Sequence, residues 1–419
     1  MKLPAFLKPK EEKSTRSPKG LLIGLGVAVI LIGFSSSVVL SEFPWTGNPI
    51  AWLNAREAYE QGNTARQKYL MEDATTKYQA AIGLFPSDWR FHNSLGLTYA
   101  SRDPKAAEKS FREALRLKPN NFEPQMNLAE CLTQQPGRAD EAEAAAKAAI
   151  QIEPRNAEAL AQLALILQSH RKPEEAEKVL QKAGSMEKDT GKYWYLVGKY
   201  HIQSGDLQRA EADLRQATEL EKTNPEYWEV LGYLVSKKND FENAELFLRR
   251  ACRLNSHNAV YWKNLGDICR QLNRIPQAED AYRRASSNNP KNAEYWLLLG
   301  LTIFAQERFS DAEYPLKQAL DLDPNDNVKW NAYINCLENQ KKYSQAAEML
   351  AKYLSIPGKE NVKTLAFLGG VLTEAREYSK ALVAFNKAKS MTKDKATIDD
   401  IDAKIKEMNA RKQGAAARK

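Results

Sequence analysis

Five tryptophans at a fixed interval of 34 residues constrain the fold of this chain more than any other feature: Trp194, Trp228, Trp262, Trp296 and Trp330. Glycine keeps the same interval at Gly198, Gly232, Gly266 and Gly300, and alanine keeps it at Ala142, Ala176, Ala210, Ala244, Ala278, Ala312 and Ala346. Such a period indicates stacked copies of one small unit that cannot bury its apolar face alone. A chain of 419 residues would otherwise suggest two or three globular domains.

One repeat, residues 259–292, contains the pattern of two helices. The apolar stripe of an amphipathic helix falls at i, i+3, i+4 and i+7, in Trp262, Leu265, Gly266 and Cys269. A polar turn follows, a second helix carries Ala278, Tyr282 and Ala285, and Pro290 ends it because proline cannot continue a helix. We therefore expect a helical hairpin, in which Gly and Ala allow the two helices to approach closely and Trp covers the junction between hairpins.

These residues resemble the tetratricopeptide-repeat (TPR) family, whose pattern is a bulky residue, Leu, Gly or Ala and Tyr, then Ala, an aromatic residue or Leu, Ala and Pro. The resemblance covers residues 55–395 in about ten repeats, of which 191–326 are the most regular. It implies an all-α fold, a right-handed superhelical solenoid of about ten helix hairpins. In the ninth repeat Ile334 replaces the expected Gly and Tyr353 the expected Ala, which indicates looser packing there.

Both ends of the array have predicted boundaries. Residues 41–54 are expected to be a linker. Residues 396–411 are expected to form a capping helix with a polar outer face, which an open solenoid end requires. Residues 412–419 are expected to be a disordered tail.

Residues 21–40 carry no charge and are long enough to cross a hydrocarbon core of about 30 Å as a helix. The preceding tail, 1–20, contains six Lys or Arg against two Glu, whereas the first basic residue after the segment is Arg56. The positive-inside rule then places the N-terminus in the cytoplasm and the repeats outside. With no Asn-x-Ser/Thr sequon in the chain, we expect a single-pass signal anchor in a bacterial inner membrane and a periplasmic array.

Two alternatives stay open for this segment. A cleaved signal peptide is one, because Ser35, Ser36 and Ser37 are small residues of the kind found at cleavage sites. A homodimer is the other, since Gly20, Gly24 and Ala28 form a small-xxx-small pattern that lets two membrane helices pack closely. Trp45 and Trp52 are expected at the membrane interface.

Composition and motifs exclude several classes of function. The net charge is +8, but residues 1–20 contribute +4 and residues 392–419 contribute +3, so the array has no basic stripe for nucleic acid. The four cysteines, at 131, 252, 269 and 336, lack metal-ligand spacing and are interpreted as core residues. No catalytic or nucleotide-binding motif is present. We therefore expect no enzyme activity, no cofactor and no metal.

The resemblance implies that partners bind the concave side, at the second, fifth, ninth, twelfth and thirteenth positions of each first helix. In the regular repeats these positions hold Lys192, Tyr195, Lys199 and Ile202, Glu229, Tyr233 and Lys237, Lys263, Asp267 and Arg270, and Leu297, Leu301 and Phe304. Exposed apolar residues in a row favour a peptide-binding groove, with Lys and Arg selecting an acidic partner. The alternative is that these side chains pack against the solenoid itself.

The sequence therefore predicts a membrane-tethered scaffold or adaptor that binds partner proteins or peptides. Two other functions stay open: a regulatory subunit that activates a separate envelope enzyme in trans, and a membrane-bound chaperone for unfolded or exported clients. A family's shared packing residues do not decide among them.

Overall fold

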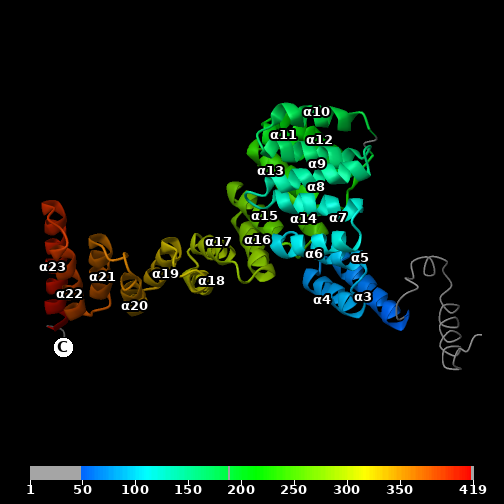
Figure 1. Ribbon diagram of the computed structural model, residues 1–419. Coiled ribbons are helices and arrows are strands. Elements are labelled where there is room, and N and C mark those ends of the chain that lie inside the picture. Colours follow the sequence, from blue (N-terminus) through cyan, green and yellow to red (C-terminus); the bar gives the residue numbers. More distant parts are fainter. Residues whose placement is uncertain (1–48, 187–188, 417–419) are drawn as a thin grey trace, which may run out of the picture. The chain divides into compact units, whose positions relative to one another are not determined.

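The computed structural model describes residues 49–186 and 189–416 of the chain (Figure 1), and within these residues it contains helices and no strands. The predicted membrane segment, 21–40, and the predicted dimer residues Gly20, Gly24 and Ala28 lie outside the described residues. No described helix combines the length and the apolar character needed to span a bilayer. The prediction of an all-α helical solenoid is confirmed over the described residues.

The helices fall into two compact units, which meet in sequence at residues 187 and 188. The N-terminal array contains four hairpins: α3 (Pro49–Gln67) with α4 (Met71–Leu84), α5 (Trp89–Tyr99) with α6 (Pro104–Leu117), α7 (Phe122–Thr133) with α8 (Ala139–Ile152), and α9 (Ala157–Ser169) with α10 (Pro173–Gly184). Within this array each helix packs against its neighbours in sequence.

The C-terminal array contains six hairpins and one further helix. The hairpins are α11 (Gly191–Ser204) with α12 (Leu207–Leu220), α13 (Pro225–Lys237) with α14 (Phe241–Leu254), α15 (Ala259–Gln271) with α16 (Ile275–Asn288), α17 (Ala293–Phe304) with α18 (Phe309–Leu322), α19 (Asn327–Asn339) with α20 (Tyr343–Leu354), and α21 (Val362–Glu374) with α22 (Tyr378–Ser390). The last helix, α23 (Lys395–Ala416), packs on α22 and α21.

The small residues of the repeat have the predicted steric role. A Cβ added to Gly266 would lie 2.6 Å from a ring carbon of Tyr282, and one added to Gly300 would lie 2.6 Å from Leu316. The facing Ala278 and Ala312 are completely buried. The two helices of a hairpin therefore approach closely only because neither carries a large side chain at this level.

The repeated tryptophans tie each hairpin to the loop that precedes it. The indole Nε1 donates a hydrogen bond to a backbone carbonyl six residues earlier: Trp228 to Lys222 at 3.0 Å, Trp262 to Ser256 at 2.8 Å, Trp296 to Pro290 at 2.9 Å, and Trp330 to Pro324 at 2.8 Å. A buried indole usually needs such a partner. The predicted covering of the junctions is thus accompanied by a specific polar contact.

Three features at the ends differ from the predictions. Helix α3 already includes Pro49, the first described residue, and therefore covers the end of the predicted linker. Trp52 is only 1% exposed, so it is a buried residue and is not available to a membrane interface. Helix α23 passes the predicted boundary at residue 411 and includes Ala416, the last described residue, and the alanines in this stretch favour helix.

The four cysteines are free and buried, as predicted for core residues. Burial raises the pKa of the Cys252 thiol to about 12 and that of the Cys269 thiol to about 11. Such thiols stay protonated at neutral pH and are poor nucleophiles.

Candidate partner-binding surface

The residues predicted to bind a partner lie on α11, α13, α15 and α17, the first helices of four consecutive hairpins. First helices also touch each other directly, as α13 touches α15 and α17 touches α19. We use the term first-helix face for the following twelve residues on these helices: Lys192, Tyr195, Lys199, Glu229, Tyr233, Lys237, Lys263, Asp267, Arg270, Leu297, Leu301 and Phe304. In the structure some of these residues are buried and others are accessible to solvent.

Tyr195 differs from its prediction because it is only 3% exposed. Its ring stacks on Tyr227 of the next first helix, with ring centroids 4.8 Å apart. Its hydroxyl donates a 2.5 Å hydrogen bond to Glu226, and the Lys199 ammonium lies 5.1 Å from the ring centroid. Tyr195 therefore joins α11 to α13 and leaves Lys199 as the accessible group at this point.

Glu229 is a half-buried carboxylate in the middle of the first-helix face. Its carboxylate accepts a 2.9 Å hydrogen bond from the Asn264 side chain. Burial, and to a smaller extent the nearby Glu226, raise the pKa of Glu229 to about 7 against the opposing effects of the Asn264 hydrogen bond and Lys199. This face therefore carries a group that changes charge near neutral pH.

Three cations of the first-helix face have no ion pair with another described residue. No carboxylate among the described residues lies within 4.0 Å of the charged nitrogens of Lys199, Lys237 or Arg270. Lys237 instead lies 5.1 Å from the ring centroid of Tyr233, which is 47% exposed. Lys263, in contrast, forms a 2.8 Å ion pair with Asp267. The unpaired cations lie on three successive first helices and are free to contact a bound carboxylate.

The apolar end of the face is less exposed than predicted. Leu301 is 36% exposed, whereas Leu297 and Phe304 are half-buried. Phe304 packs edge-to-face on Phe309, with ring centroids 5.0 Å apart. Val260 is 47% exposed and was missed, although it occupies the second position of its first helix. The position rule used for the other residues predicts it.

A second arrangement runs along the second helices of the hairpins. The fifth residue of α6, α8, α12, α14, α16 and α18 is a glutamate, and its carboxylate binds a basic residue shortly before the start of the next second helix. The pairs are Glu108 with Arg138 at 2.8 Å, Glu143 with Lys172 at 3.0 Å, Glu211 with Lys238 at 2.6 Å, Glu245 with Arg274, Glu279 with Arg308 at 2.8 Å, and Glu313 with Lys342 at 2.5 Å. We call these pairs the carboxylate ladder.

Two of the ladder glutamates, Glu143 and Glu108, are held in the ionised form. Lys147 is the main cause at Glu143, and together with Lys172 it lowers the pKa to about 2. Burial would raise the pKa of Glu108, but hydrogen bonds from Arg138 and Arg112 outweigh it and bring the pKa to about 2. A glutamate spaced by 34 residues from Glu143 to Glu313 was the sequence signal for this ladder, and it was not recognised.

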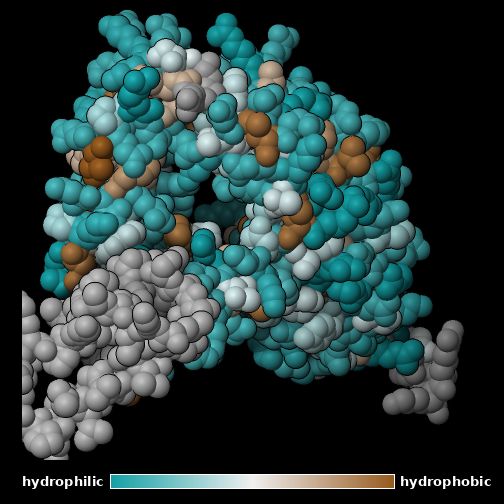
Figure 2. Space-filling view, turned by 90° about the vertical axis from the view of Figure 1, so that its right-hand side faces the viewer, coloured by the Kyte–Doolittle hydropathy of each residue, from teal (hydrophilic) through white to brown (hydrophobic). Residues whose placement is uncertain are grey.

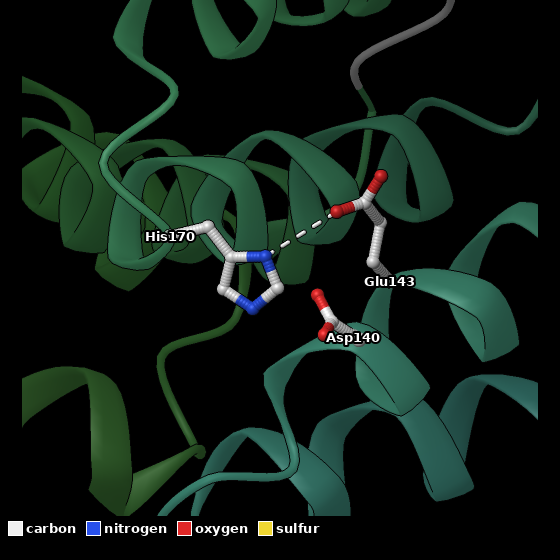
Figure 3. A group of neighbouring side chains, drawn as sticks. All are labelled: Asp140, Glu143 and His170. Atoms are coloured by element: carbon white, nitrogen blue, oxygen red, sulfur yellow. Dashed lines mark ion pairs between the residues drawn. The ribbon is translucent and has the colours of Figure 1, made fainter.

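One step of the ladder also resembles a metal site. Asp140, Glu143 and His170 offer ligand atoms that all lie within 4.8 Å of one another (Figure 3), and the buried Nε2 of His170 has no hydrogen-bond partner. However, the ammonium groups of Lys147 and Lys172 contact the Glu143 carboxylate at 2.5 and 3.0 Å. These charges oppose a further cation at the same oxygen atoms. The arrangement therefore fits an ion-pair cluster better than a metal centre.

The molecular surface is mainly hydrophilic on the side shown in Figure 2, and hydrophobic residues occur there as separate spots. A partner on such a surface would be held by polar contacts around a few apolar anchors.

Comparisons with known proteins agree with the repeat pattern. Tetratricopeptide-repeat models match residues 99–145, 135–200 and 195–259, and a model of the C-terminal domain of cilia and flagella-associated protein 70 matches residues 231–408. No curated protein sequence matches the chain.

Several solved structures are similar in fold. Pseudomonas aeruginosa pilF is 20% identical, with 50% of this chain and 95% of that chain covered at a TM-score of 0.41. The human IFIT1 dimer with PPP-AAAA is 15% identical, with 80% and 82% covered at a TM-score of 0.47. A TPR protein of Thermus thermophilus is 19% identical, with 43% and 98% covered at a TM-score of 0.38. At such identities the likeness concerns the fold alone.

The registers of Trp, Gly and Ala, the consecutive hairpins and the matching repeat models agree, and residues 99–259 match the tetratricopeptide repeat.

Proposed function

We propose that this chain is a membrane-tethered scaffold or adaptor that binds an acidic segment of a partner protein on the first-helix face. Proteins of the tetratricopeptide-repeat family generally mediate protein–protein interactions. The observation that carries the proposal is the row of unpaired cations, Lys199, Lys237 and Arg270, beside the exposed Tyr233 and Leu301. On the second helices, by contrast, the ladder glutamates neutralise the neighbouring cations.

The unpaired cations favour a partner with two or three carboxylates. Each would form a charge-assisted hydrogen bond without first breaking an internal ion pair. The exposed aromatic and aliphatic side chains, Tyr233 and Leu301, would take the apolar residues of the same segment. Aromatic anchors surrounded by polar contacts are typical of peptide-binding surfaces.

The tether is residues 21–40, and the array is placed on the periplasmic side of a bacterial inner membrane. The absence of charge over these residues and the basic tail before them support this topology. A reporter fused to the C-terminus, active only outside the cytoplasm, tests it in whole cells. A reporter active only inside the cytoplasm would refute this topology.

Charge reversal tests the binding face. Lys237→Glu with Arg270→Glu should reduce partner capture from detergent-solubilised membranes at least tenfold, because two attractive contacts become repulsive. The matched control is Lys317→Glu with Arg250→Glu, since both residues are exposed on second helices and lack an ion pair among the described residues. Unchanged capture by the first variant would refute the proposed face.

Mass spectrometry of the captured proteins distinguishes the alternative functions. One stoichiometric structural protein supports the scaffold. One stoichiometric enzyme supports a regulatory subunit, and many substoichiometric proteins support a chaperone.

A further inference from the structure

The first-helix face has two parts that differ in charge. Its unpaired cations, Lys199, Lys237 and Arg270, lie on α11, α13 and α15. The next two first helices, α17 and α19, are described in full and contain a single cation, Lys329. That ammonium group is 6% exposed and is held by two aspartates at 2.9 and 2.5 Å. Over these five described helices, the accessible positive charge therefore ends at α15.

The carboxylates beside the unpaired cations are already bound within the fold. Asp267 pairs with Lys263 at 2.8 Å and accepts a 2.7 Å hydrogen bond from the Tyr282 hydroxyl. Glu229 accepts a 2.9 Å hydrogen bond from the Asn264 side chain. The three cations therefore remain available to carboxylates that a bound segment brings.

The part of the face on α17 is apolar. Leu297, Leu301 and Phe304 follow one another at i, i+4 and i+7, so they form one stripe along the helix. Leu301 is 36% exposed, whereas Leu297 and Phe304 are half-buried. Glu294, exposed at the second position of α17, adds a negative charge to this part of the face. An apolar side chain is therefore favoured over a carboxylate here.

The spacing of the first helices fixes the spacing of contacts along a bound segment. The rings of Tyr195 and Tyr227 join α11 to α13, α13 touches α15, and Ala259 and Tyr295 place α15 and α17 in one buried cluster. Packed helices lie about 8–10 Å apart, and an extended chain advances about 3.3–3.6 Å per residue. One step from helix to helix therefore corresponds to about three residues of the segment.

We infer that the acidic segment bound by this face is ordered, with a carboxylate at about every third residue over α11, α13 and α15 and an apolar side chain one step further, over α17. This inference rests on the function proposed above and specifies the sequence of the partner, read in one of the two chain directions. The carboxylates would meet Lys199, Lys237 and Arg270, and the apolar side chain would meet Leu301. Tyr233, which is 47% exposed, would cover an intervening residue.

Four fluorescein-labelled peptides of equal composition test this order with the full-length chain in detergent. Each has ten residues, with three glutamates and one leucine at the first, fourth, seventh and tenth positions and with serine and glycine elsewhere. The leucine stands first or tenth in two peptides, and fourth or seventh in the other two. In fluorescence anisotropy, one peptide with a terminal leucine should bind about tenfold more tightly than both peptides with an internal leucine. Equal binding of all four would overturn the order.

Leu301→Lys should change the preferred order, a gain of binding that unfolding cannot produce. It extends the row of cations onto α17, so a peptide with glutamate at all four positions should bind this variant about tenfold more tightly than it binds the wild type. The control Val383→Lys adds the same charge at a 68% exposed position of α22 and should bind as the wild type does. An equal gain in both variants would overturn the assignment of Leu301.

The variant K237E/R270E separates this inference from the proposed function. If all four peptides bind equally and this variant loses them all, the face is correct and the order is wrong. If no peptide binds but capture of the native partner still requires Lys237 and Arg270, the order is again wrong and the proposed function stands. If neither peptide binding nor partner capture responds to the variant, both are wrong. A thermal melt followed by circular dichroism confirms that each variant is folded.

Discussion

Replacing Gly266 by alanine should destabilise the C-terminal array, whereas the same change at Gly370 should stabilise it. Both glycines lie inside first helices, in α15 and α21. An added Cβ at Gly266 would lie 2.6 and 2.8 Å from two ring carbons of Tyr282, while one at Gly370 would meet nothing within 4 Å. The Tyr282 ring cannot easily move, because it is fully buried and its hydroxyl donates a 2.7 Å hydrogen bond to Asp267.

The magnitude follows from two opposing effects. Alanine is more favourable than glycine inside a helix by about 1 kcal/mol, and this gain is the same at both sites. Overpacking a close contact costs about 1–3 kcal/mol, and the fixed ring places Gly266 near the upper value. We therefore expect Gly266→Ala to lose about 2 kcal/mol and Gly370→Ala to gain about 1 kcal/mol.

Urea unfolding of both variants, followed by circular dichroism, measures the difference. Neighbouring hairpins unfold together in a repeat array, so the midpoint of the same transition has to be compared with that of the wild type. Because the helix-propensity gain cancels between the two variants, the remaining difference of about 3 kcal/mol reports packing alone. Equal shifts in the same direction would refute the idea that close approach of α15 and α16 requires glycine.

Three further changes test the electrostatics and the hairpin junctions. Glu143→Gln should lose up to about 3 kcal/mol at pH 7, because the folded-state pKa of about 2 lies below the unfolded value near 4.5. This contribution is complete above pH 4.5 and disappears as the pH falls through 2, so urea midpoints of variant and wild type should converge there. The wild type should lose thermal stability as the pH rises from about 4.5 to 7, because the folded-state pKa of Glu229 is raised to about 7. Glu229→Gln should remove this part of the pH dependence. Trp262→Phe removes the indole bond to the Ser256 carbonyl and should lower the free energy of unfolding by about 1 kcal/mol in urea titrations.

The hairpins could be predicted because the repeated residues are the packing residues. Gly266 and Ala278 are small for a reason that holds in every hairpin, so their spacing predicts the contact between the two helices. The ends could not be placed equally well. Helix α3 includes residues of the predicted linker and α23 passes the predicted boundary at residue 411, because helix formation there depends on local preferences that no repeat pattern encodes.

The candidate site could be predicted less well than the hairpins. Helical periodicity places Tyr195 on the first-helix face, but it says nothing about Tyr227 and Glu226, which come from the next hairpin and bury it. The carboxylate ladder was missed although its glutamates recur every 34 residues, because the cations that bind them come from the next hairpin. Glu143 looks like one of several acids near a helix start until Lys172, from the following hairpin, is placed beside it.

Recognition in this array has to come from positions where the repeat varies. The eighth residue of α11, α13, α15 and α17 is always glycine, because packing leaves no alternative. The ninth residue is a different chemical type in each helix: Lys199, Tyr233, Asp267 and Leu301. Successive first helices therefore pack in the same way but carry chemically different side chains at the ninth position. A segment bound one hairpin out of register would meet a hydroxyl or a carboxylate in place of an ammonium group. The varying ninth residue would therefore select a single binding register, although the backbone repeats regularly.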